Sequence, residues 1–198
     1  MKNNLFKETS IIDDLINLSM KNILVNIQKN NKIFINELDY QYTLALELKK
    51  ESKNIEQVNI YIEFNELNIN MGLSMNLDEN KINNKKTGNK FWQLDIVIEL
   101  NERYYIIELK YGYDRSGTGG RLNLSQAVRG KNGFINDIEK IHNLMNKFSN
   151  INKGYCILLT MSNEKVYAKK YTNRKIFDDA KWIDIGLYSY YIQEINNT

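Results

Sequence analysis

Two neighbouring stretches of the chain have the apolar pattern of β-strands. Residues 94–100 and 104–110 are rich in β-branched and aromatic side chains, and a short polar segment, 101–103, separates them. Runs of this length on either side of a short polar turn are typical of a β-hairpin. We therefore expect two antiparallel strands here, with further elements before and after them in the chain.

The segment 10–30 repeats apolar residues at helical spacing. Ser10 followed by the acidic Asp13 has the pattern of a helix N-terminal cap. The stripe that would face the core comprises Ile12, Leu15, Ile16, Ile23 and Ile27. We expect a structural helix over this segment.

A second helix is predicted from Glu37 to about Lys50, with Asn36 as its cap. Glu37 and Gln41 are four residues apart, so they share one face of this helix and can reach a common site. An acid in the first turn is also favoured by the helix dipole alone, so Glu37 is either a site residue or a simple N-terminal charge. The apolar face expected for this helix comprises Leu38, Tyr42, Ala45 and Leu46.

The remaining pattern predicts strands at 57–64, 154–161 and 165–171, a tail at 182–195, and a helical region at 124–148 that is broken near Gly130 and Gly133. The helical region repeats apolar residues on one face: Phe134, Ile138, Ile141, Met145 and Phe148. The segment 112–121 is rich in glycine but lacks the spacing of a phosphate-binding P-loop. No internal repeat or linker is evident, so we expect one domain over 1–198.

The register of the predicted hairpin decides whether two acids meet. If Asn101 and Glu102 form a two-residue loop, Asp95 lies opposite Glu108, and Lys110 shares the face of Glu108. Facing carboxylates repel unless a cation lies between them, which favours a hard divalent ion such as Mg²⁺. A three-residue loop would shift the register by one and place the acids on opposite faces.

Composition narrows the class of protein. The chain has 198 residues, 42% of them hydrophobic, which is enough for a sizeable core, and it has no run long enough to cross a membrane and no signal-peptide pattern. We expect a cytoplasmic protein without a membrane partner. The single cysteine, Cys156, lies in a strand-like run, and the single histidine, His142, lies in a helical one. These numbers disfavour Cys/His catalysis and exclude a Cys/His zinc cluster.

The net charge of +3 does not by itself indicate nucleic-acid binding. Basic residues nevertheless flank the predicted hairpin and are candidates for holding a phosphate backbone. Before it stand Lys81, Lys85, Lys86 and Lys90, and after it stand Arg115, Arg121, Arg129 and Lys131. The lysines at 81–90 serve equally well as solvated loop residues.

The order of the predicted elements and their charged residues resembles the PD-(D/E)XK, or restriction endonuclease-like, superfamily. The resemblance covers residues 36–161: a helix with a leading acid, three strands, a helix and a strand, with an aspartate on the second strand and Glu-x-Lys on the third. It implies an α/β fold with an α-β-β-β-α-β core, a central mixed sheet flanked by helices, an extra N-terminal helix and a C-terminal extension. One departure is the proline of the motif, replaced here by Leu94.

The resemblance also implies a function and assigns roles. Asp95, Glu108 and Lys110 look like the motif residues, and Glu37 looks like the acid of the first core helix. These residues would be catalytic in a Mg²⁺-dependent nuclease, with Mn²⁺ as a substitute and DNA in preference to RNA, in restriction, defence or repair. Metal ligands would be Asp95, Glu108, the Leu109 carbonyl and Glu37. Substrate contacts would come from Gln41, Arg115, Arg121, Gln126 and Arg129.

Two alternatives stay open at the level of sequence. One keeps the fold without catalysis, as a nucleic-acid-binding or protein-interaction module. The other is an unrelated α/β domain whose acids lie on the surface. A homodimer would be needed for symmetric cleavage of both strands of a duplex.

Overall fold

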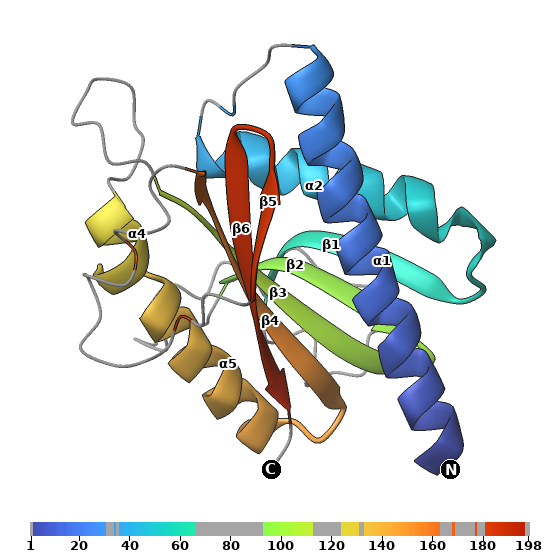
Figure 1. The fold of residues 1–198 in the computed structure, drawn as a ribbon. Helices are drawn as coiled ribbons and strands as arrows, with labels where there is room; N and C mark the ends of the chain where they lie inside the picture. The colour runs from blue at the N-terminus through green and yellow to red at the C-terminus, as the bar shows by residue number, and fades with distance from the viewer. Residues whose placement is uncertain are drawn as a thin grey trace, which may run out of the picture.

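The computed structural model describes residues 2–30, 34, 36–65, 93–112, 124–130, 133–162, 168, 177 and 181–196. Within them the chain forms a six-stranded mixed β-sheet flanked by helices (Figure 1). The helices are α1 (Lys2–Lys29), α2 (Glu37–Glu51), the short 3-10 helix η1 (Ser52–Asn54), α4 (Leu124–Arg129) and α5 (Phe134–Lys147). The strands are β1 (Val58–Asn65), β2 (Gln93–Leu100), β3 (Arg103–Tyr111), β4 (Ile151–Met161), β5 (Trp182–Ile185) and β6 (Tyr188–Asn196).

The strands lie in the order β1-β2-β3-β4-β6-β5. Only β3 and β4 run parallel, and the other neighbours are antiparallel. Because parallel strands need a crossover, the chain between β3 and β4 passes over one face of the sheet through α4 and α5. This crossover brings α5 against β3 and β4 and so against the charged end of β3.

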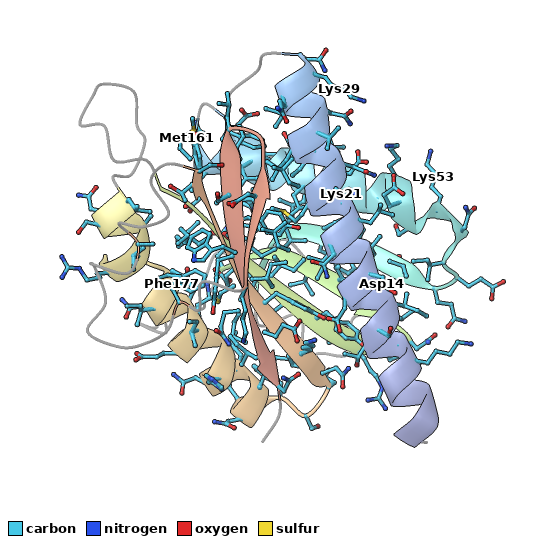
Figure 2. The ribbon with its side chains drawn as sticks, in the orientation of Figure 1. Asp14, Lys21, Lys29, Lys53, Met161 and Phe177 are labelled. Carbon is cyan, nitrogen blue, oxygen red and sulfur yellow. The ribbon has the colours of Figure 1, made fainter. Side chains whose placement is uncertain are left out.

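A hydrophobic core lies between each face of the sheet and the helices that pack on it. Figure 1 shows α1 and α2 on one side of the sheet and α4 and α5 on the other. The first core joins α1 and α2 to one face, and the second joins α4 and α5 to the opposite face. Figure 2 shows side chains filling both layers, with Phe177 on the α5 side, where its ring packs against those of Phe134 and Tyr191. The sheet is therefore buried on both faces.

Most of the predicted elements are present. The hairpin strands, the strand near 57–64 and the strand near 154–161 are confirmed as β2, β3, β1 and β4. The tail folds as the β5–β6 hairpin, and the predicted helical region is broken into α4 and α5 at the two glycines. Asn36 caps α2 as expected, with its Oδ1 accepting a hydrogen bond from Asp39 N (2.8 Å). Cys156 is buried in β4, and His142 is exposed on α5.

The start of the first helix was predicted wrongly. The helix α1 begins at Lys2, so Ser10 lies inside it and is no cap. Tertiary contacts hold the earlier turns: Glu8 accepts a hydrogen bond from Asn101 Nδ2 (2.9 Å) and lies 3.7 Å from Arg103 Nε. Asp13, assigned to the cap, instead pairs with Lys153 across the sheet (2.7 Å). The apolar stripe predicted for this helix is buried as expected.

The apolar face predicted for α2 is also wrong in three of its four residues. Ala45 is buried, but Leu38, Tyr42 and Leu46 are exposed. The helix carries two rows of apolar side chains, and the row that contains Tyr40 packs on the sheet. The ring of Tyr40 packs against Phe34, and its hydroxyl contacts Met20 Sδ (3.1 Å). The buried residues of α2 are Tyr40, Gln41, Leu44, Ala45 and Leu48.

The strand expected at 165–171 falls outside the described residues, apart from the buried Ala168, whose backbone is helical there. The glycine-rich segment 113–121 and the lysines of 81–90 also lie outside them. Among the helices that are described, none is both long and apolar enough to cross a lipid bilayer.

Candidate active site

The register of the β2–β3 hairpin places the two predicted acids together. Leu100 pairs with Arg103, so the loop has two residues, Asn101 and Glu102, both with positive φ (51° and 63°). Two central residues in this left-handed region form the tight turn that matches the twist of a hairpin. The last ladder pair is Ile96 and Ile107, and Asp95 and Glu108 occupy the next positions. The three-residue loop is excluded.

Asp95 is held from two directions. Its Oδ2 accepts a hydrogen bond from Leu109 N on β3 (2.7 Å), so the carboxylate bridges the strands just beyond their last ladder pair. Its backbone carbonyl accepts a hydrogen bond from Gln41 Nε2 on α2 (2.7 Å). Gln41 is buried, and it therefore fixes the start of β2 against the helix. The substrate contact predicted for Gln41 stays a prediction.

Glu108 is a nearly fully buried acid, with 2% of its surface exposed. Its Oε1 lies 2.7 Å from Lys140 Nζ on α5. Burial raises the pKa of Glu108 to about 8, and the negative charges of Asp95 and Asp137 act in the same direction, while Lys140 opposes them. The surroundings of Glu108 thus disfavour the ionised form of its carboxyl group.

Lys110 is buried among oxygen atoms. Its Nζ lies 2.9 Å from the Leu109 carbonyl, 3.1 Å from Asp137 Oδ2 and 3.2 Å from Glu37 Oε1. Burial alone would lower the pKa of Lys110, but the surrounding carboxylates, led by Asp137 and Glu37, raise it above its ordinary value. The side chain is therefore a fixed ammonium group, with one oxygen near each of its three protons.

Glu37 reaches the same place from the first turn of α2. Its Oε1 contacts Lys110, and its Oε2 accepts a hydrogen bond from Tyr111 N (3.2 Å). Burial raises the pKa of Glu37, while Lys110 lowers it and Asp95 raises it. Both carboxylate oxygens of Glu37 are thus engaged by β3, and its role as a site residue stays a prediction.

Two residues of this cluster were missed by the sequence analysis. Asp137 and Lys140 lie one turn apart near the start of α5 and pair with Lys110 and Glu108 respectively. The signal was present: Asp137 falls on the apolar face, three residues after Phe134 and four before Ile141. A carboxylate inside an apolar stripe is costly to bury without a partner, so it marks a buried charged site.

The other predicted residues divide into two groups. Gln126 and Arg129 lie at exposed positions of α4, where Arg129 Nη2 donates a hydrogen bond to Ser125 Oγ (3.3 Å). Arg115 and Arg121 lie outside the described residues. Substrate contacts by these four residues stay predictions.

The acid–lysine cluster, as we name it, comprises Asp95, Glu108, Glu37, Asp137, Lys110 and Lys140. Two of its buried oxygens, Glu108 Oε1 and Asp137 Oδ2, lie at ion-pair distance from an ammonium but accept no well-directed hydrogen bond. Within the described ranges, there is no group of three or more His, Cys, Asp or Glu side chains that could hold a metal ion.

Comparisons with models of known protein families, with curated proteins and with solved structures find no match to this chain. Its function therefore has to be inferred from the acid–lysine cluster itself.

Proposed function

We propose that this chain is a metal-dependent nuclease that hydrolyses phosphodiester bonds, with DNA as the first substrate to test. The observation that carries the proposal is the convergence of Asp95, Glu108 and Lys110 where the β2–β3 ladder ends. Paired acids for a hard cation, with a fixed ammonium beside them, are the groups that a displacement at phosphorus requires.

The topology supports a restriction endonuclease-like core. The chain runs through α2, β1, β2 and β3, crosses by α4 and α5, and returns as β4 parallel to β3. The acids lie on β2 and β3, with Glu37 leading α2. This is the order implied by the resemblance over residues 36–161, with α1 added before it and β5 and β6 added after it.

The donor groups of the cluster fit Mg²⁺, with Mn²⁺ as a substitute. Mg²⁺ prefers oxygen ligands and keeps several of its waters, so two protein carboxylates suffice to hold it. Asp95 and Glu108 would hold the ion, and the Leu109 carbonyl is a further candidate ligand. The buried Glu108 Oε1, which accepts no directed hydrogen bond, is the observation that fits a cation best. A bound ion would polarise the phosphate and lower the pKa of a water molecule.

Lys110 would act as an ammonium group rather than as a base. Its pKa lies above the ordinary value, so it holds its proton at neutral pH and cannot accept one from water. An ammonium at this place stabilises the negative charge that develops on a phosphate oxygen. Glu37 and Asp137 then serve as positioning residues, because they hold the Lys110 Nζ from α2 and α5.

The test is a cleavage assay with labelled single- and double-stranded DNA and RNA in Mg²⁺, in Mn²⁺ or in EDTA. Asp95→Asn is the matched control, because its amide oxygen can still accept the hydrogen bond from Leu109 N while the negative charge is lost. We expect cleavage by the wild-type protein that stops in EDTA and falls by at least about a hundredfold in the variant. Equal cleavage by the variant, or binding of nucleic acid without cleavage, would refute the proposal.

A further inference from the structure

The two lysines of the acid–lysine cluster differ in how firmly they are held. Lys110 is buried and lies among three oxygens. Lys140 has a side chain that is 17% exposed, and it reaches in from α5 to Glu108 Oε1 (2.7 Å) and the Gln93 carbonyl (3.0 Å). Lys140 is therefore the ammonium that can leave the site.

The charges of the cluster do not balance. Its four carboxylates carry four negative charges when ionised, and its two lysines carry two positive charges, which leaves two negative charges in excess. Lys110 is shared by Glu37 and Asp137, so Lys140 is the counterion left for Glu108 and the neighbouring Asp95. A divalent cation in place of the Lys140 ammonium adds one positive charge and so reduces this excess from two negative charges to one.

The Nζ of Lys140 occupies the position that a cation bound to Glu108 would take. Its Nζ contacts the buried acid of β3 and, at the same time, the carbonyl of Gln93, two residues before Asp95 on β2. An ammonium group and a divalent cation compete for the same carboxylate oxygen, because each supplies positive charge to it.

We propose that Lys140 is an internal competitor for the cation: its ammonium lies against Glu108 Oε1 in the cation-free protein and is displaced when a single divalent cation binds at Asp95 and Glu108. This inference rests on the proposed function for the position of the ion. It adds a residue on α5 that weakens cation affinity while it stabilises the cation-free site.

The test measures binding of Mn²⁺ alone, without nucleic acid, by calorimetry and by the paramagnetic resonance signal of the free ion. Lys140→Met is compared with Lys147→Met, which removes a positive charge from an exposed position two turns along the same helix. We expect one ion per chain, about tenfold tighter binding by Lys140→Met, and wild-type affinity for Lys147→Met. The gain should vanish when Asp95→Asn is added.

Thermal unfolding gives a second readout. In EDTA, Lys140→Met should unfold at a lower temperature than the wild type, since Asp95 and Glu108 have lost a neighbouring positive charge. Saturating Mn²⁺ should raise its midpoint more than that of the wild type. If Lys140→Met does not fold, Lys140→Gln replaces it, because a carboxamide can still donate to the Gln93 carbonyl.

The outcomes separate the two proposals. Equal or weaker Mn²⁺ binding by the Lys140 variants, with wild-type binding that depends on Asp95, overturns the role of Lys140 and leaves the proposed function standing. Absence of Mn²⁺ binding in every protein overturns both. Two ions bound per chain would contradict a single site at Asp95 and Glu108.

Discussion

Two lysines are buried on adjacent strands of the sheet, and each is paired with two carboxylates. Lys153 on β4 lies 2.7 Å from Asp13 and 2.8 Å from Glu194. Lys110 on β3 lies 3.1 Å from Asp137 and 3.2 Å from Glu37. Their burial is similar, yet we assign a function to one and a structural role to the other.

The surroundings of the two lysines explain this assignment. Near Lys153, the hydroxyl of Tyr155 donates a hydrogen bond to the same oxygen of Asp13 (2.7 Å), and the side chain of Glu194 is 51% exposed to water. Both acids thus have a partner or solvent. Near Lys110 lie two further carboxylates, Asp95 and Glu108, and one further lysine, Lys140. The buried Glu108 Oε1 and Asp137 Oδ2 each face an ammonium but accept no well-directed hydrogen bond.

The difference teaches which buried charges deserve a functional hypothesis. An ion pair closed by hydrogen bonds joins α1 to the sheet and needs no ligand. A cluster with an excess of buried negative charge is unfavourable by itself, and it persists in proteins mainly where a ligand or a reaction uses it.

Glu108→Gln should give the largest contrast between the two regions. We expect cleavage to fall by about a thousandfold, since a cation ligand is lost. Stability in EDTA should rise above about pH 8, where Glu108 is ionised, because a neutral amide is easier to bury than a carboxylate. The matched control is Glu194→Gln beside Lys153, which should change the cleavage rate by less than about twofold. Cleavage assays and urea unfolding check both results. Similar cleavage rates for Glu108→Gln and Glu194→Gln would contradict the functional difference between the two regions.

Lys153→Met should show the opposite behaviour. Removal of this buried cation leaves Asp13 without its ion-pair partner, and we expect the free energy of unfolding to fall by about 3 kcal/mol. The cleavage rate per folded molecule should stay at the wild-type value. Urea unfolding and cleavage at a temperature where the variant is folded measure the two effects. An inactive but stable Lys153→Met protein would show that the ion pairs of Lys153 contribute to the reaction.

The pH dependence of stability should also separate the regions. The pKa of Glu108 is raised by burial from 4.5 to about 8, so the folded protein binds a proton that the unfolded chain releases between these values. Stability in EDTA therefore falls as pH rises through this window, by about 1.4 kcal/mol per unit for that proton. Glu108→Gln should remove this part of the slope, whereas Glu194→Gln should not. Equal slopes in the wild type and Glu108→Gln would contradict the raised pKa.

Much of the candidate site could be predicted from local sequence because hairpin geometry is local. The strand runs and the two-residue loop set the register, and the register sets the neighbours of Asp95 and Glu108. Asn36 likewise determines where α2 begins, which brings Glu37 to the site.

The remainder depends on packing between distant segments. The face of α2 that is buried is decided by the space for Tyr40 between Phe34, Met20 and the sheet, and the sequence offers a second apolar row, Leu38, Tyr42 and Leu46, that is equally helical. Asp137 and Lys140 were missed because only the parallel crossover from β3 to β4 brings α5 over Glu108 and Lys110.

The most direct test of the central claim is the rate of DNA cleavage in Mg²⁺ by the wild-type protein and by Asp95→Asn, purified and assayed side by side with EDTA controls. We predict cleavage by the wild type, loss of cleavage in EDTA, and a rate at least about a hundredfold lower for a folded Asp95→Asn protein. An Asp95→Asn protein that cleaves at the wild-type rate would show that the acid–lysine cluster is not the catalytic site.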